Sequence, residues 1–217
     1  MDEFWTAAEM DFRARAAELF RNLPDPSTPE PARLPEEIWR ELDALALEET
    51  DPIPVSAAHL SGRVSIFDEA SRHDPRLGHE LLAWFERSHN LDPAGWTACE
   101  LGRLAGTASH VFAAGTAAAR ERGYFSSILM DFRMVQERLA GLHAGSELAR
   151  LGACRLCRLL VKGDTIAAGR ETSGLAAWAR TLEADVRSVS GSLLGPEWTQ
   201  NRLAASNSPF PEERTGR

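Results

Sequence analysis

A chain of 217 residues is long enough to bury a substantial core, as one large or two small domains. Its formal net charge of -8 is unevenly distributed, because residues 1–51 sum to -9 and the remainder to +1. The composition therefore argues against general nucleic-acid binding, which requires a basic face. Charged residues also interrupt the apolar runs well before the ~18 residues of a transmembrane helix, so we expect no membrane span.

The N-terminal part of the chain predicts helices joined by proline-rich connectors. Five prolines between 23 and 35 exclude both a helix and an interior strand there. Asp74 followed by Pro75 is typical of an N-cap and the first helical residue. The predicted helices of this part run over 3–22, over 36–48, from Val64 to the break at His73, and from Pro75 to Arg87.

A loop is predicted over 88–96, and we place a structural boundary there. Small residues crowd the helix predicted over 97–121, which indicates close approach of neighbouring helices and hence a buried, central position. Further helices are predicted over 129–162 and over 165 to about 192, with Gly163 ending the first of them. The tail over 200–217 is polar.

No alternating segment of useful length indicates a strand, so the predicted fold class is all-α. The expected division is an N-terminal helical region over 1–90, a C-terminal helical bundle over 91–200 and a disordered tail over 201–217.

Three cysteines cannot all pair within one chain, and the sequence does not open on a signal-peptide h-region. We therefore expect a cytoplasmic protein with reduced thiols. Cys154 and Cys157 have the spacing of a metal site, but they lie within a predicted helix and have no second pair. We interpret them as small apolar side chains on a packed face and predict no metal site.

The segment 122–151 carries the most specific pattern, an aromatic turn between two helices followed by a long helix. It resembles the acyl-CoA dehydrogenase family, in which Arg-x-x-Phe-Gly joins two helices and a Phe-Gln-x-x-Gln helix containing Glu-x-Ala-Arg-Leu follows. Ser126 replaces the glycine of that turn, and Arg133 replaces the first glutamine. The matching residues are Arg122, Phe125, Phe132, Gln136, Glu147, Ala149, Arg150 and Leu151.

Weaker similarity extends over most of the chain. It implies N-terminal helices joined directly to an acyl-CoA dehydrogenase C-terminal-like bundle, without the middle β domain that the family places between them. In the family that domain provides much of the flavin and acyl-thioester environment. The resemblance thus implies FAD as a possible cofactor, which this shortened chain has either kept or lost.

The resemblance also implies positions for the cofactor. The residues at the family's FAD contacts are Arg122, Phe125, Leu129, Arg133 and Gly195. A purely structural explanation stays open, in which Arg122 caps its helix and Phe125 fills the corner of the hairpin. Arg133 could pair with a pyrophosphate.

Glu100 is the candidate catalytic base. The family reaction removes the α-proton of an acyl-CoA with a glutamate while the β-hydrogen leaves as hydride to the flavin. In one branch that glutamate lies at the start of the first bundle helix, and Glu100 lies one turn beyond the matching place. The alternative is an ordinary capping or surface glutamate in the first turn of a helix.

Three hypotheses for function follow. The first is flavin-linked dehydrogenation of an acyl-CoA, possible only with a partner subunit or an altered site. The second is a non-catalytic assembly or regulatory subunit that pairs with a full-length homologue or sequesters an acyl-thioester. The third is a flavin-independent enzyme acting on an acyl-thioester. The expected partners are another copy of the chain or a full-length homologue, with acyl-CoA as a possible ligand.

Overall fold

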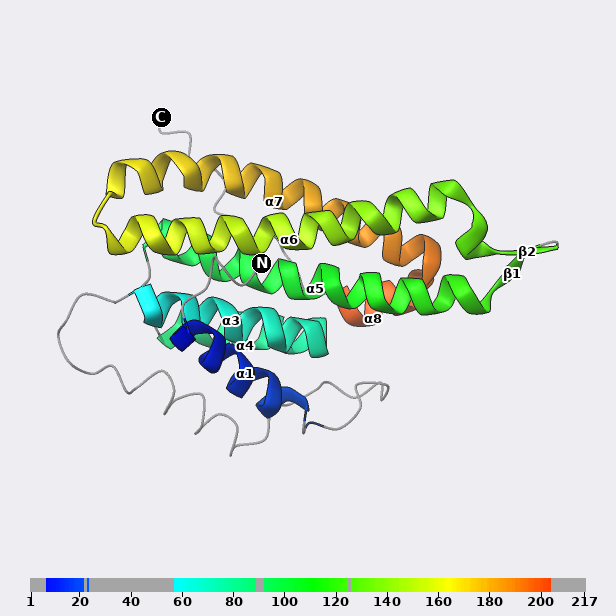
Figure 1. Ribbon diagram of the computed structural model, residues 1–217, viewed down its shortest axis with the longest axis horizontal. Helices are drawn as coiled ribbons and strands as arrows, with labels where there is room; N and C mark the ends of the chain where they lie inside the picture. Colours follow the sequence, from blue (N-terminus) through cyan, green and yellow to red (C-terminus); the bar gives the residue numbers. More distant parts are fainter. Residues whose placement is uncertain (1–6, 22, 24–56, 89–91, 125, 204–217) are drawn as a thin grey trace.

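In the computed structural model the described part of the chain is built almost wholly from helices, which confirms the all-α prediction (Figure 1). The structure describes residues 7–21, 23, 57–88, 92–124 and 126–203. Three consecutive helices have 29 residues each, and a two-stranded hairpin and a 3₁₀ turn separate the first of them from the second. The elements are α1 (Ala7–Arg21), α3 (Ala57–His73), α4 (Pro75–Ser88), α5 (Pro93–Glu121), β1 (Gly123–Tyr124), β2 (Ser127–Ile128), η2 (Leu129–Asp131), α6 (Arg133–Val161), α7 (Thr165–Leu193) and α8 (Pro196–Leu203).

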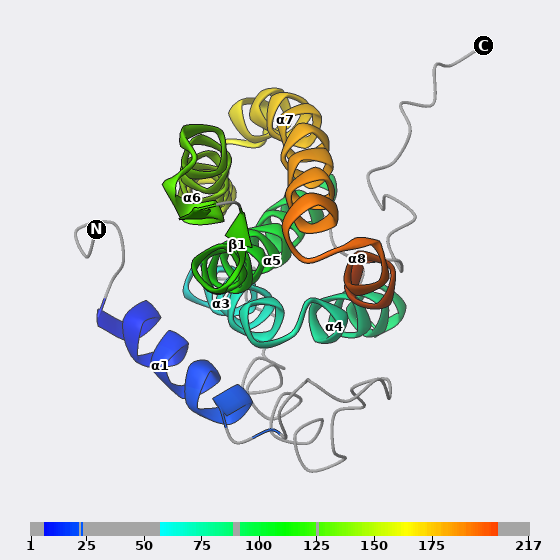
Figure 2. The same ribbon diagram turned by 90° about the vertical axis from the view of Figure 1, so that its right-hand side faces the viewer.

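Helix α5 occupies the centre of the molecule, as its small residues predict. Seen end-on in Figure 2, α6 and α7 lie on one side of α5, with α3 and α4 on the other. Every residue from Thr97 to Ala108 is buried. A Cβ atom added at Gly102 or Gly106 would collide with backbone of α3, so glycine is what allows these two helices to approach so closely.

The turn predicted between the two long helices is a β-hairpin at one end of the bundle. Gly123 pairs with Ile128 and Tyr124 with Ser127, and the hairpin projects beyond the neighbouring helices in Figure 1. At the opposite end, Gly163 with φ 69° ends α6 as predicted. The side chain of Asp164 then caps α7 by accepting a hydrogen bond from Ala167 N.

Three predicted helix starts are wrong. Helix α3 begins at Ala57 and not at Val64, and Leu60 in its first turns is already buried in the core. Helix α5 begins at Pro93 and not at 97, because Asp92 accepts a hydrogen bond of 2.6 Å from Gly95 N. This is the same Asp-Pro pattern that correctly predicted the start of α4. Helix α6 also begins later than predicted, at Arg133, because Leu129–Asp131 forms a 3₁₀ turn.

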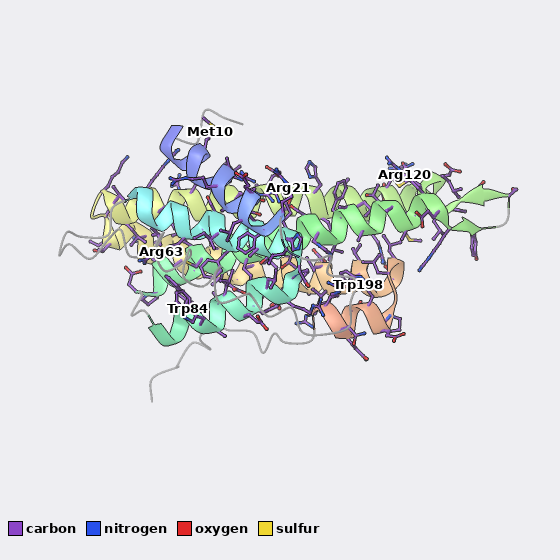
Figure 3. All side chains as sticks on the ribbon, turned by 90° about the horizontal axis from the view of Figure 1, so that it is seen from below. Met10, Arg21, Arg63, Trp84, Arg120 and Trp198 are labelled. Atoms are coloured by element: carbon purple, nitrogen blue, oxygen red, sulfur yellow. The ribbon has the colours of Figure 1, made fainter. Side chains whose placement is uncertain are left out.

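Helix α8 was not predicted, since the last helix was expected to stop at Gly195. Tertiary contacts account for it: Leu203 is buried, and Arg202 forms an ion pair of 2.9 Å with buried Asp74. Trp198, which is labelled on this helix in Figure 3, stacks on His110 with 5.9 Å between the ring centroids. The helix extends three residues into the predicted tail. The rest of that tail and the helix predicted over 36–48 lie outside the described residues.

The buried apolar side chains of the described helices form one cluster, to which both sides of residue 90 contribute. The predicted boundary itself falls within 89–91, outside the described residues, so the domain division stays a prediction. Among the helices that the structure describes, none combines the length and the apolar character needed to cross a bilayer.

Candidate functional site

The candidate base Glu100 is completely buried in α5 and paired with Arg103, one turn further along the same helix. Arg103 Nε donates to Glu100 Oε2 at 2.7 Å, and Nη2 donates to Oε1 at 2.5 Å. Its remaining nitrogen, Nη1, lies 3.0 Å from Nε2 of His79 on α4. Because a guanidinium can only donate, the His79 Nε2 atom is the acceptor and the ring proton is on Nδ1.

Burial and the neighbouring charges together shift the pKa values of this triad, which consists of Glu100, Arg103 and His79. Burial raises the pKa of Glu100, against the opposing effect of the Arg103 charge. Burial disfavours the charge of Arg103, but the facing Glu100 outweighs it and raises the pKa of Arg103. Burial, together with the charges of Arg103 and Arg187, lowers the pKa of His79 to about 2. A substrate would have to displace Arg103 to reach Glu100, and the catalytic role of Glu100 stays a prediction.

A second buried network surrounds Asp68 of α3. Arg150 of α6 donates to its carboxylate twice, from Nε at 2.7 Å and from Nη2 at 3.0 Å, and Nη2 also donates to Ser109 of α5 at 2.7 Å. Arg13 of α1 approaches the same carboxylate at 3.3 Å. Burial disfavours the charge of Asp68, but Arg150, with Arg72 and Arg13, outweighs it and lowers the pKa of Asp68. The network therefore joins α1, α3, α5 and α6.

The residues at the predicted flavin positions are distributed around the hairpin end. Arg122 caps the C-terminus of its own helix, α5, because its backbone N–H donates to the carbonyl of Ala118 at 3.1 Å. Its side chain also donates from Nη1 to the carbonyl of Leu193 at 2.7 Å, at the C-terminus of α7. This contact brings Arg122 close to Gly195, which has φ 102° at the turn into α8. Leu129 is half-buried in η2. Phe125 lies outside the described residues.

Arg133, the remaining predicted flavin contact, lies on the surface. Its side chain is 89% exposed and pairs with Glu137 at 2.7 Å. Arg122 and Arg133 thus each have a partner within the chain. A cavity of about 270 Å³ is found at the opposite end, between the starts of α5 and α7 and the end of α6, lined by Asp92, Leu160, Thr165, Ala168 and Thr172 among others. Flavin binding stays a prediction.

The four leucines that stand out in α6 lie on different faces. Leu139 and Leu142 are buried, whereas Leu148 is 54% exposed and Leu151 is 41% exposed. The reason is helical geometry, because the nine residues from 139 to 148 make two and a half turns. Leu148 and Leu151 belong to a continuous exposed row that we name the α6 seam. It consists of Met134, Glu137, Gly141, Ala144, Leu148, Leu151, Arg155 and Arg158, all of which are exposed.

The cysteines lie as predicted, on packed faces. Cys154 and Cys157 are buried in α6, and Cys99 is buried in α5. Burial raises the pKa of the Cys99 thiol to about 12, which disfavours the thiolate. Within the residues that the structure describes, no three His, Cys, Asp or Glu side chains are grouped closely enough to hold a metal ion.

Sequence reasoning missed the partners of the buried charges. A signal was nevertheless present, because Arg103 stands between Leu101-Gly102 and Leu104-Ala105, where a charge can be buried only with a partner. Glu100 lies three residues before Arg103, a spacing that places the two side chains on the same face of a helix and indicates Glu100 as that partner. His79 and Asp68 had no such signal, because their contacts come from other helices.

Comparison with protein-family models, with curated proteins and with solved structures found no match to this chain.

Proposed function

We propose that this chain is a non-catalytic assembly subunit that binds another polypeptide through α6 and the hairpin. The observation that carries the proposal is where the large exposed apolar side chains lie. Among the described residues, all of them except Met10 fall between Tyr124 and Ile166. Four of them, Met134, Leu148, Leu151 and Val161, lie on α6, and a group of exposed apolar side chains is typical of an interaction surface.

The geometry around Glu100 also supports this proposal over catalysis. Proton transfer requires a base within hydrogen-bonding reach of the substrate. Glu100 is 0% exposed and gives both carboxylate oxygens to Arg103. We assign it to joining α4 and α5 through Arg103 and His79.

Flavin-linked dehydrogenation of an acyl-CoA, as the resemblance of 122–151 implies, is the alternative. The contact of Arg122 with the carbonyl of Leu193 favours it, because Leu193 lies two residues before Gly195, another of the implied flavin contacts. In a dimer, further contacts could be supplied by the second chain.

Light scattering and flavin binding measured on one preparation separate the two functions. We expect a mass of at least two chains at micromolar concentration, no yellow colour after purification, and no change in flavin fluorescence when the protein is titrated into FAD. A monomer would contradict the assembly function. A yellow protein that takes up FAD with micromolar affinity would instead support the dehydrogenase, and Arg122→Met should then weaken that uptake.

A further inference from the structure

The α6 seam has the spacing of a coiled-coil interface. Its members follow one another at alternating intervals of three and four residues from Met134 to Arg158, which is the heptad repeat of helices that pair along their length. Helices α5 and α7 pack against the opposite side of α6, so the seam faces outward in the described part of the chain (Figure 2).

The two halves of the apolar centre differ in size. Gly141 and Ala144 form the first half, and Leu148 and Leu151 form the second. A Cβ atom added at Gly141 would meet nothing within 4 Å, so the space above this glycine is open. The seam is therefore shallow in one half and has projecting side chains in the other. A second seam that runs in the opposite direction has a complementary shape.

We propose that the α6 seam pairs with the α6 seam of a second copy of this chain, antiparallel, about a two-fold axis between Ala144 and Leu148. This inference rests on the assembly function proposed above and names the partner. In this register Leu148 lies over Ala144 of the second copy, and Leu151 lies over its Gly141. Each large side chain fills the space above a small one. Each residue at one of the two apolar heptad positions faces a residue at the other position, as in an antiparallel pair of helices.

The charges of the seam fit the same register. Glu137 faces Arg155 of the second copy, and by symmetry Arg155 faces its Glu137, so opposite charges meet at both ends of the apolar centre. Each already has a partner within its own chain, Arg133 for Glu137 and Glu171 for Arg155. Surface pairs of this kind are weak and exchange easily, and complementary charges across an interface mainly fix its register.

Neighbouring registers lose this complementarity. Sliding one copy by a heptad in one direction places Glu137 over Leu148 and leaves Gly141 opposite Ala144, with a gap between them. Sliding it the other way places Arg155 over Ala144. Both registers place a charged side chain over an apolar one and lose the facing of Glu137 with Arg155, which costs free energy.

The ends of the molecule agree with an antiparallel pair. The hairpin lies at one end of α6 and the α6–α7 turn at the other (Figure 1). The hairpin end exposes Tyr124, Ile128 and Phe132, while Val161 and Ile166 are exposed around the turn. Antiparallel pairing brings the hairpin of each copy to the end of α6 that leads into the α6–α7 turn of the other.

Disulfide trapping tests the register directly. Gly141→Cys and Leu151→Cys are prepared as separate variants, mixed at micromolar concentration and oxidised. The mixture should form a cross-linked dimer, whereas each variant alone should not, because a residue at 141 lies about 15 Å along the axis from its own copy. The unmodified chain is the control for its native cysteines. Cross-linking of Gly141→Cys with itself would overturn the antiparallel arrangement.

Charge exchange is the second test. Leu148→Glu should reduce the dimer association constant at least 100-fold, with unchanged helical circular dichroism. Glu137→Arg should weaken it several-fold, and adding Arg155→Glu to the same chain should restore it. The same double substitution would leave binding weakened if the two positions did not face each other. Ala140→Glu, exposed on α6 but outside the seam, is the matched control.

Failure of this pairing is distinguishable from failure of the assembly function. An oligomer that persists in Leu148→Glu and gives no cross-link in the mixture overturns the α6 pairing but leaves the assembly function intact. A chain that is monomeric without any substitution contradicts both.

Discussion

Arg103 is the residue on which the buried polar chemistry of α5 depends. It satisfies both oxygens of Glu100 and the lone pair of His79 with separate nitrogens, which is possible because the planar guanidinium presents donors in several directions. An unpartnered charge at this depth would be very unfavourable. The triad therefore couples the protonation of His79 to the packing of α4 on α5.

The pH dependence of unfolding follows from His79. Its pKa is about 2 in the folded chain and near the ordinary 6.5 when unfolded, so below pH 6.5 the unfolded chain binds one proton more. Protonation of His79 therefore does not lower the free energy of unfolding above pH 6.5. As the pH falls from 6.5 towards the folded pKa, that free energy decreases by about 1.4 kcal/mol per pH unit.

His79→Gln isolates the effect, because the glutamine oxygen can still accept from Arg103 but does not titrate. Urea unfolding at pH 7 and pH 5 should show a loss for the unmodified chain that exceeds the loss for the variant by about 2 kcal/mol. Parallel losses in the two proteins would contradict the placement of His79 in this network.

At the scale of elements, α8 shows how a short helix is held by contacts from other parts of the chain. Eight residues are too few to be stable alone in water, so docking must supply the stability. The contact between Arg202 and Asp74 links α8 to the corner between α3 and α4, and Asp74 also pairs with Arg76 at 2.7 Å. Removal of Arg202 leaves the carboxylate with a partner, so the loss should be local.

Arg202→Gln should accordingly loosen α8 without unfolding the bundle. Hydrogen exchange of the α8 amides should accelerate about tenfold, which corresponds to ~1.4 kcal/mol, while the amides of α5 keep their protection. Arg170→Gln, an exposed substitution on α7, is the control and should leave α8 unchanged. Acceleration throughout the molecule would show that α8 does not open separately.

At the scale of the whole molecule, the Asp68–Arg150 network and the close approach of α3 to α5 make the N-terminal helices and the long helices one packed body. Asp68 contacts arginines from α1 and α6 as well as Arg72 of its own helix. A pair that connects so many elements contributes to cooperativity as well as to stability.

Arg150→Met should therefore destabilise the fold by about 3–5 kcal/mol, since it leaves the Asp68 carboxylate buried with fewer donors. Urea unfolding followed by circular dichroism measures the change, and a lower m-value would indicate that the N-terminal helices separate first. Arg138→Met, an exposed substitution on the same helix outside the α6 seam, should change stability little. Equal effects of the two substitutions would contradict the central role of Arg150.

How far the sequence predicts the structure differs from residue to residue. The Asp74-Pro75 pattern located α4, and Gly163 located the end of α6, because caps act within one turn of the chain. Asp92-Pro93 is the same kind of pattern and does start α5. The prediction followed the loop-like composition of 88–96 instead, and it therefore placed the start of α5 too late. Leu148 and Leu151 have the same spacing of three residues as Leu139 and Leu142. The second pair is exposed and the first is buried because the two pairs lie at different angles around the helix.

The sequence by itself determined the helical class, the central position of α5 and the turn between α5 and α6, though not its two short strands, because these follow from periodicity, small residues and local turn chemistry. Only the tertiary structure decided what the polar residues do. It joined His79 to Arg103, placed Arg150 on Asp68 and docked α8 through Arg202 and Asp74. Those outcomes depend on contacts between segments distant in the chain, and such contacts leave no periodic pattern in the sequence.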